Sequence, residues 1–281
     1  MTLNDLYREG ISILNSHDIE DADFDARCIL QFLLNVNTTQ FFLNRSESVD
    51  NETSEIYFKL IDARKNGTPL QYILGKWEFM GNEFFVGEGV LIPRPETEIL
   101  VGLAEDYLKE KENPVVVDFC SGTGCIAVSI AKLFPKAKIF AVEKYDEAFS
   151  YLKKNIELNE VKNVFAVKGD IFDKNVIKGI FPDLIVSNPP YIKQNEIQNL
   201  SREVRNEPIT ALDGGNDGYD FYRFLADFWL DKYLPDTSAM FVECGEDQGD
   251  YIRKLFSEYS EKSEVVYDFN NLQRVVTAFR S

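Results

Sequence analysis

Roughly the first 70 residues place apolar side chains at the three- and four-residue spacing of amphipathic helices. No strand-like alternation or glycine-rich loop interrupts this part before Gly67-Thr68-Pro69, a typical helix breaker. We therefore predict a small helical bundle. The apolar positions that mark its successive helices are Leu3, Leu6, Ile13 and Leu14, then Phe24, Cys28, Phe32 and Leu33, then Phe41–Leu43, and finally Ile56, Leu60 and Ile61.

A β-hairpin is predicted directly after this bundle. Residues 76–80 alternate in polarity with the two-residue period of a strand, and residues 83–86 resume the same pattern. Gly81-Asn82 stands between the two runs, and a glycine in the first position suits a type II′ turn. The hairpin would join the helical part to a chain segment of a different pattern.

From residue 93 onward, short β-branched runs alternate with helical segments. Pro93 and Pro95, followed by Glu96 and Glu98, are typical of the first turn of a helix. Strand–helix alternation predicts parallel βαβ units in a doubly wound, Rossmann-like α/β sheet. The predicted strands are 115–119, 138–142, 163–167, 183–186, 239–242, 265–269 and 274–279, the last two an antiparallel pair, and the predicted helices include 125–133 and 147–158.

The composition narrows the chemistry that such a fold can perform. The 281 residues include 47 Asp and Glu against 30 Lys and Arg, which gives a net charge of −17 and a pI of about 4.6. This balance argues against the overall basic footprint of a nucleic-acid-binding protein. A single histidine, His17, cannot build a histidine-rich zinc site, and we predict no metal.

Nothing in the sequence predicts export or membrane insertion. The N-terminal residues lack a basic region followed by an apolar one, and no run approaches the roughly 18 apolar residues of a membrane span. The four cysteines are scattered without a disulfide framework, so we expect buried free thiols. We therefore expect a cytoplasmic protein.

Four candidate features follow four successive predicted strands. In open α/β sheets, ligands bind at the carboxyl ends of the strands. Each feature alone has a plain structural explanation, such as a turn or a solvated carboxylate, but their order fits one bound nucleoside. They are the segment Asp118, Phe119, Cys120, Ser121, Gly122, Thr123 and Gly124, then Glu143, then Asp170, and then Asn188, Pro189, Pro190 and Tyr191.

The first three features favour S-adenosylmethionine over a dinucleotide. A dinucleotide turn needs a third glycine, which is absent after Gly124, and the carboxylate of Asp118 would repel a diphosphate. Asp118 suits a cofactor with a cationic amino-acid end. Glu143 lies 143 − 122 = 21 positions beyond Gly122, the spacing of an acid that binds ribose hydroxyls. Asp170 could accept a hydrogen bond from the adenine amino group.

The fourth feature suggests the reaction. The Asn188 side-chain oxygen and the Pro189 carbonyl can accept two hydrogen bonds from one planar NH₂ group, and the Tyr191 ring can stack on it. Two successive prolines make this turn rigid. With the nitrogen aimed at a sulfonium methyl group, methyl transfer depends on positioning more than on an acid or base. We predict Asn188, Pro189 and Tyr191 as catalytic residues.

Four segments resemble the HemK/PrmC protein-glutamine methyltransferases, and the resemblance covers essentially the whole chain. It implies methylation by S-adenosylmethionine, with S-adenosylhomocysteine as product, of the side-chain nitrogen N5 of the glutamine in the Gly-Gly-Gln motif of class I peptide chain release factors. It also implies a class I methyltransferase fold. The segments are residues 91–98, 118–124, 186–192 and 207–215.

The resemblance also implies roles for the parts of the chain. Residues 1–74 would form a helical domain that docks the release factor, residues 75–92 a hairpin linker, and residues 93–281 the methyltransferase domain of an expected monomer. Cys120 to Gly124, Glu143 and Ile171 would line the cofactor site, and Asn188 to Tyr191 would hold the substrate amide, with Asn188 bordering both. Two positions depart from the family pattern: Cys120 replaces the first glycine of the turn, and Ile171 replaces a common tryptophan.

Three other functions fit parts of the same pattern. A DNA adenine-N6 methyltransferase uses the same four-residue segment, but the net charge of −17 argues against stable nucleic-acid binding. A glutamine methyltransferase of a ribosomal protein is a second alternative, although residues 207–215 look more like the release-factor branch. A non-catalytic nucleoside-binding protein would have no need for two converging amide acceptors at Asn188 and Pro189.

Overall fold

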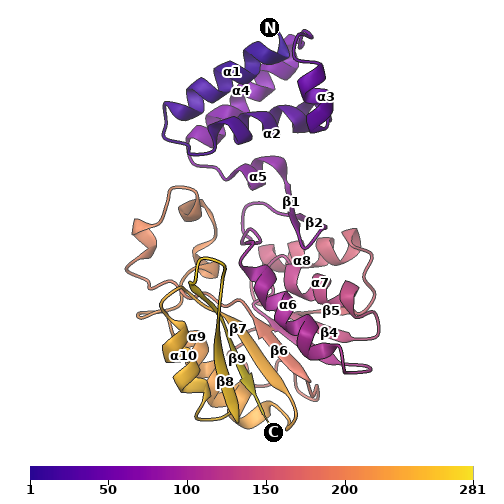
Figure 1. Ribbon diagram of the computed structural model, residues 1–281, viewed down its shortest axis with the longest axis vertical. Coiled ribbons are helices and arrows are strands. Elements are labelled where there is room, and N and C mark those ends of the chain that lie inside the picture. The colour runs from indigo at the N-terminus through magenta and orange to yellow at the C-terminus, as the bar shows by residue number, and fades with distance from the viewer. Residues whose placement is uncertain (281) are drawn as a thin grey trace. The chain divides into compact units, whose positions relative to one another are not determined.

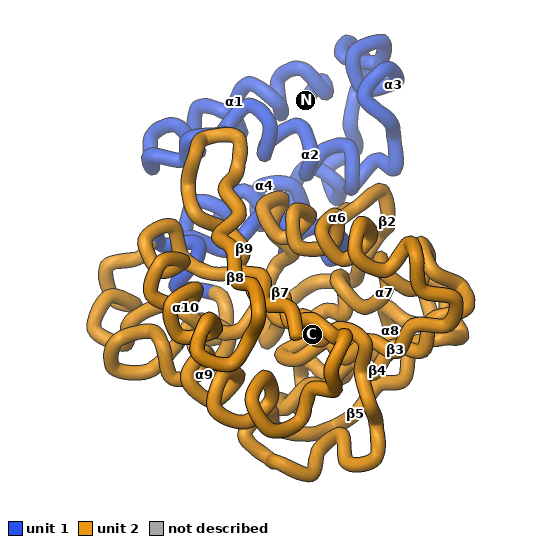
Figure 2. The backbone as a smooth tube through the Cα atoms, turned by 60° about the horizontal axis from the view of Figure 1, so that its bottom comes forward, with its two compact units in different colours: residues 1–76, 201–206 blue, residues 77–200, 207–281 orange. Residues whose placement is uncertain are grey.

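Helices α1 to α5 form the first of two units into which residues 1–280, those described by the computed structural model, divide (Figures 1 and 2). This unit comprises Met1–Lys76 together with Ser201–Asn206 from far along the chain. Thr2 and Asp5 form a reciprocal cap at the start of α1, which satisfies backbone N–H groups that a helix otherwise leaves unpaired. The helices are α1 Leu3–Asn15, α2 Ala22–Leu34, α3 Thr38–Leu43, α4 Asn51–Lys65 and α5 Leu70–Leu74.

The predicted apolar stripe on α2 does not coincide with the buried face of that helix. Phe24 and Phe32 are 42% and 50% exposed, whereas the buried apolar positions of α2 are Ala22, Ala26, Ile29 and Leu30. Small alanines at two of the buried positions let neighbouring helices approach closely. Phe24 and Phe32 lie on the surface of the unit instead.

A buried ion pair connects this unit internally. Arg64 of α4 contacts Asp25 of α2 and Glu203, at 2.6 Å from each, and Arg64 and Asp25 are both almost fully buried. Asn206 donates to the Gly67 carbonyl at 2.9 Å. Removing one partner of such a buried pair leaves an uncompensated charge, so Arg64 holds the segment Ser201–Asn206 within the helical unit.

The predicted hairpin forms, but the predicted turn is wrong. Strands β1 (Lys76–Phe79) and β2 (Asn82–Phe85) pair around Met80 and Gly81, whose φ angles are 50° and 68°. Two positive φ values define a type I′ turn instead of a type II′ turn. The apolar Phe79 and Phe84 side chains fix this register, because both are buried in the core of the second unit.

The second unit, Trp77–Leu200 together with the chain from Glu207 onward, contains a seven-stranded sheet in the order β5-β4-β3-β6-β7-β9-β8. Strands β3 to β7 are parallel, and β9 runs antiparallel to both of its neighbours. The Rossmann-like α/β prediction is confirmed. The strands are β3 Val115–Phe119, β4 Lys138–Glu143, β5 Val164–Lys168, β6 Leu184–Ser187, β7 Ala239–Glu243, β8 Lys262–Tyr267 and β9 Gln273–Phe279.

Helices cover both faces of this sheet (Figure 1). Successive β3 residues face opposite layers: Val116 packs with Ala127 and Leu100 on one side, and Val117 packs with Trp229 on the other. The hydrophobic pattern had not indicated α9, the π-helical η4 or α10. The helical segments are α6 Thr97–Leu108, α7 Cys125–Leu133, α8 Asp146–Leu158, α9 Asp220–Phe224, η4 Leu225–Tyr233 and α10 Gly249–Phe256, with short 3₁₀ turns at Ile197–Asn199, Val204–Asn206 and Ile209–Ala211.

Strand order reverses at β3, whose neighbours are β4 on one side and β6 on the other. Connections leave such a point in opposite directions, which opens a crevice at the carboxyl ends of the strands. The fold therefore places a ligand site beside β3 and β6. Among residues 1–280, the structure contains no helix that is long and apolar enough to cross a membrane.

Candidate active site

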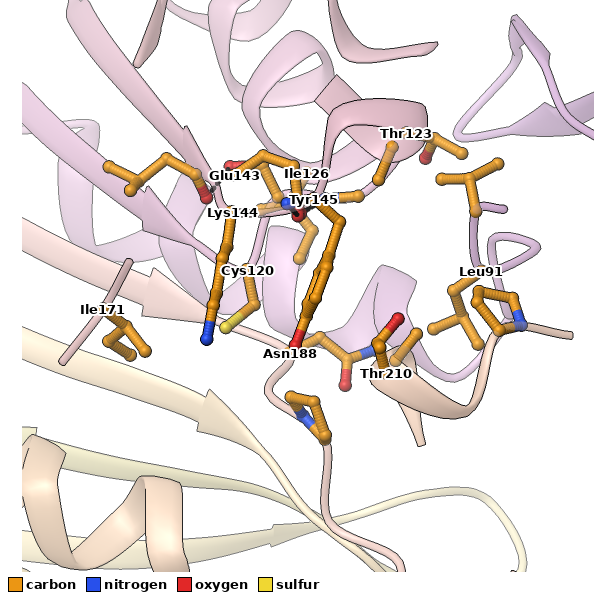
Figure 3. Close-up of a pocket in the computed structure, with 18 of the residues that line it drawn as sticks. Leu91, Cys120, Thr123, Ile126, Glu143, Lys144, Tyr145, Ile171, Asn188 and Thr210 are labelled. Carbon is orange, nitrogen blue, oxygen red and sulfur yellow. Dashed lines mark hydrogen bonds between the residues drawn. The ribbon is translucent and has the colours of Figure 1, made fainter. Parts of the chain in front are cut away.

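A cavity of about 930 Å³, part of it open to solvent, lies at the carboxyl ends of β3, β4 and β6 (Figure 3). Four residues predicted from sequence, Asp118, Gly124, Pro189 and Tyr191, do not line it. The predicted residues that do line it are Cys120, Ser121, Gly122, Thr123, Glu143, Asp170, Ile171, Asn188 and Pro190.

The turn after β3 bends sharply beneath this cavity. Cys120, Gly122 and Gly124 have φ angles of 58°, 53° and 81°, all in the left-handed region that favours glycine. A Cβ at Gly124 would lie 2.5 Å from Leu152 Cδ1, so a side chain there would collide with α8. Cys120 adopts the glycine-like conformation although it carries a side chain, and that side chain projects into the cavity (Figure 3).

Glu143 is held rigidly at the end of β4. Its two carboxylate oxygens accept hydrogen bonds from the backbone N–H groups of Gly122 at 3.0 Å and Tyr145 at 2.7 Å. The side chain is buried yet lines the cavity. Each carboxylate oxygen has a second lone pair, so this acid can accept hydrogen bonds from the hydroxyl groups of a ribose.

Asp170 and Ile171 form the next wall. Asp170 accepts a hydrogen bond from the Phe172 N–H at 3.0 Å and pairs with the Lys144 ammonium at 2.9 Å. Lys144, which belongs to none of the sequence motifs, extends into the cavity (Figure 3). The buried Ile171 side chain supplies an apolar surface, and its carbonyl accepts a hydrogen bond from the indole of Trp229 at 2.9 Å.

Asp118 lies behind the turn, fully buried, and neither of its carboxylate oxygens has a hydrogen-bond partner. Burial, with a smaller contribution from the nearby charge of Glu143, raises its pKa from 3.8 to about 8. An unpartnered buried carboxyl is costly in the folded protein unless a cation neutralises it. Contrary to the expectation from the sequence, Asp118 does not face the cavity directly.

The Asn188 loop follows β6 directly. Its Nδ2 atom donates to Thr97 Oγ1 at 3.3 Å, and Ser187 beside it donates to the Phe119 carbonyl at 2.8 Å. The carbonyl of Tyr191 accepts a hydrogen bond from Gln248 at 3.0 Å. Tyr191 packs against the core, burial raises its pKa, and it does not line the cavity.

Two segments that stood out only through the family resemblance close the site. The buried carboxylate of Glu207 accepts a hydrogen bond from the Ile92 N–H at 3.0 Å and forms an ion pair with Arg94. Gly214 packs on the Tyr191 backbone, where a Cβ would lie 2.7 Å from Tyr191 Cα. Residues 91–98 and 207–215 are thereby fixed to each other and to the Asn188 loop.

The sheet order, with its antiparallel strand β9, and the cavity at its switch point are those of a class I S-adenosylmethionine-dependent methyltransferase. Residues 5–75 match the family described as PrmC N-terminal domain, and residues 107–211 match the TRM5/TYW2 methyltransferase domain. The chain belongs to the release factor glutamine methyltransferase family. A member from Aquifex aeolicus (strain VF5) is 36% identical over 257 residues, which cover 91% of this chain and 90% of the relative.

Other relatives agree with this assignment and with the resemblance noted from the motifs. A release factor glutamine methyltransferase from Clostridium botulinum is 35% identical over 281 residues, 99% of each chain. Among solved structures, the hMettl16 catalytic domain in complex with an RNA hairpin has a TM-score of 0.58 at 15% identity over 82% of each chain. That likeness concerns the fold alone. The family and fold predictions are confirmed, and the cofactor is S-adenosylmethionine.

The orphaned carboxyl of Asp118 makes the stability of the ligand-free protein dependent on pH. Because its pKa is raised from 3.8 to about 8, the folded state binds more protons than the unfolded state between these values. Its contribution to the unfolding free energy therefore falls as pH rises through this window. We expect Asp118→Asn to flatten the decline measured by denaturant unfolding from about pH 4 to pH 9, and to be more stable than the unaltered protein at the upper end. Parallel curves for the two proteins would contradict this electrostatic account.

Proposed function

We propose that this protein transfers the methyl group of S-adenosylmethionine to N5 of the glutamine in the Gly-Gly-Gln motif of class I peptide chain release factors. The observation that carries the proposal is the Asn188 amide at the edge of the cofactor cavity, with its Nδ2 turned toward Thr97 and its oxygen left for a substrate. The family named after this reaction on release factors supports the choice of substrate.

The residues around the cavity have distinct proposed roles toward the cofactor. Glu143 accepts hydrogen bonds from the ribose hydroxyls, Asp170 faces the adenine amino group, and Ile171 covers the adenine ring. The turn from Cys120 to Gly124 gives the backbone close access, and Asp118 stabilises the cationic end from behind it. When bound, the sulfonium supplies an electrophilic methyl group.

The substrate amide is held by acceptors alone. Asn188 Oδ1 and the Pro189 carbonyl would each accept one N–H of the glutamine side chain, which orients its nitrogen toward the methyl group. Pro190 and Tyr191 would keep this loop rigid. As the N–CH₃ bond forms, the bond between this methyl group and the sulfonium sulfur would break to leave S-adenosylhomocysteine, and one amide proton would go to solvent. Positioning of this kind can supply about 7–11 kcal/mol of the barrier reduction, so the chain needs no histidine base.

The helical part has a proposed docking role. Residues 1–74 would bind the body of the release factor, and residues 93–281 would perform the methyl transfer. Residues 75–92 would link these two domains. The exposed Phe24 and Phe32 on α2 supply an apolar surface that suits a protein partner. We expect a monomer that acts in the cytoplasm, where release factors act, without stable nucleic-acid binding because of its net charge of −17.

The direct test incubates the protein with radiolabelled S-adenosylmethionine and three acceptors: a class I release factor, the same factor with the Gly-Gly-Gln glutamine changed to alanine, and duplex DNA. We expect label on the first acceptor only, because the site holds one primary amide. Label on DNA, or equal label on the altered factor, would contradict the proposal. Label on a ribosomal protein in place of the release factor would favour the ribosomal alternative.

A second prediction concerns Asn188. Asn188→Ala removes one of two acceptors for the substrate amide, so kcat should fall by about 10²- to 10³-fold. Cofactor binding, measured by calorimetry, should change little because the turn and Glu143 remain. Asn175→Ala, at an exposed position outside the cavity lining, serves as the matched control. Turnover near that of the unaltered enzyme would remove Asn188 from the mechanism.

A further inference from the structure

The orientation of the Asn188 amide raises a problem that the loop alone does not solve. A carboxamide has an oxygen and an NH₂ group at nearly equivalent positions, and a half-turn exchanges them. Only one orientation presents the oxygen to a substrate amide. The reversed orientation would present NH₂ to NH₂ and could not bind the glutamine nitrogen. Groups behind Asn188 must therefore distinguish its two ends.

Thr97 contacts the NH₂ group of the Asn188 amide, the end that points away from the substrate. It begins α6, is 2% exposed, and its Oγ1 lies 3.3 Å from Asn188 Nδ2. A hydroxyl can either donate or accept a hydrogen bond. Thr97 by itself would therefore tolerate both orientations of Asn188, and its own hydroxyl direction must be set by another group.

Glu243 supplies that group from the next strand. It ends β7, which runs parallel to β6 with Val242 opposite Ser187, so the two strand ends lie side by side. It is 3% exposed, its Oε2 has no hydrogen-bond partner, and it does not line the cavity. Burial is the main reason that its pKa is raised from 4.5 to about 7, and the side chains of Thr97 and Asn188 act in the opposite direction.

We propose that Glu243 is a positioning residue whose carboxylate, through Thr97, fixes the Asn188 amide with its oxygen toward the substrate. An ionised carboxylate only accepts hydrogen bonds. The Thr97 hydroxyl therefore donates to Glu243 and offers its lone pair to Asn188 Nδ2. If Asn188 were reversed, its oxygen would face the lone pair of Thr97 and the carboxylate of Glu243, which are both acceptors. This repulsion disfavours the reversed orientation.

A purely structural role for the Glu243 side chain is a poor explanation of these contacts. The structural hydrogen bond at this position uses its backbone carbonyl, which accepts from the Tyr222 hydroxyl at 2.8 Å and would remain with any side chain. Arg274, whose charge lowers the pKa of Glu243, pairs instead with Asp268 at 2.9 Å. A buried carboxylate without a salt bridge lowers stability, which points to a role in the reaction.

This inference rests on the proposed function, and its test uses variants of the full-length enzyme. Glu243→Met keeps the size of the side chain and removes the acceptor, Glu243→Gln retains a carbonyl acceptor, and Thr97→Val removes the hydroxyl. Thr277→Val, at a buried threonine of β9, is the matched control for the last change. The readouts are kcat and KM for the release factor, the cofactor dissociation constant by calorimetry, and thermal unfolding, all above the pKa of Glu243 at about pH 8.5.

We expect Glu243→Met and Thr97→Val each to lower kcat by about 10- to 100-fold, with cofactor affinity changed less than about threefold. Glu243→Met should unfold at a temperature no lower than the unaltered protein, because a buried charge has been removed. Glu243→Gln should recover part of the lost kcat. The double variant of Glu243→Met and Thr97→Val should be no slower than the slower single variant. Both changes break the same relay, the chain of hydrogen bonds from Glu243 through Thr97 to Asn188.

Three results would overturn the relay: unchanged kcat in Glu243→Met, a loss of kcat matched by loss of cofactor affinity and of thermal stability, or effects that multiply in the double variant. An unaltered enzyme that fails to label the release factor glutamine would contradict the proposed function itself, and the relay with it. Failure of the relay alone leaves the unaltered enzyme fully active, so the two failures are distinguishable.

Discussion

The direction of the hydrogen bonds around Asn188 is the constraint on which the activity depends. The site offers only acceptors to a planar NH₂ group, and the Asn188 amide presents its oxygen there only when its own NH₂ group points away from the substrate. The Asn188 Nδ2 contact with Thr97 meets this condition at 3.3 Å. Burial of Thr97 keeps water from competing for the same atoms.

The rest of the fold brings the acceptors for the substrate amide and the cofactor site to the same edge of the sheet, at the carboxyl ends of its strands. The reversal of strand order at β3 places Glu143 at the end of β4 and Asn188 after β6, on either side of the turn that follows β3. Segments 91–98 and 207–215, distant in sequence, are joined by Glu207 and close over the same edge. The fold therefore positions the substrate amide beside the cofactor site, and methyl transfer depends on this placement and not on an acid or base.

The central strands and several helices could be predicted from the sequence because each depends on a local pattern of apolar and polar residues. The β-branched runs gave the central strands, and helix α7 begins and ends where the pattern predicts. The hairpin was predicted with the wrong turn, because Met80 occupies a left-handed conformation that a glycine or asparagine usually takes. Helices α9 and α10 are only five and eight residues long, and they are stabilised by packing of Tyr222, Ile252 and Phe256 in the core.

The parts of the site that escaped sequence reasoning act through tertiary contacts. Asp118 was expected to face the ligand, yet it lies behind the turn, because strand periodicity does not reveal depth at a strand end. Lys144 and Glu243 belong to no motif considered, and only the neighbouring strand ends bring them to Asp170 and Thr97. A carboxylate at the end of a fully buried strand such as β7 is the signal that could have identified Glu243.

The most direct measurement is neutron diffraction from crystals of the protein with S-adenosylhomocysteine and a glutamine peptide, which distinguishes the oxygen of Asn188 from its deuterated nitrogen. The account predicts that Oδ1 faces the glutamine side-chain nitrogen and that Nδ2 donates to Thr97. Nδ2 facing the glutamine, with the oxygen toward Thr97, would contradict it.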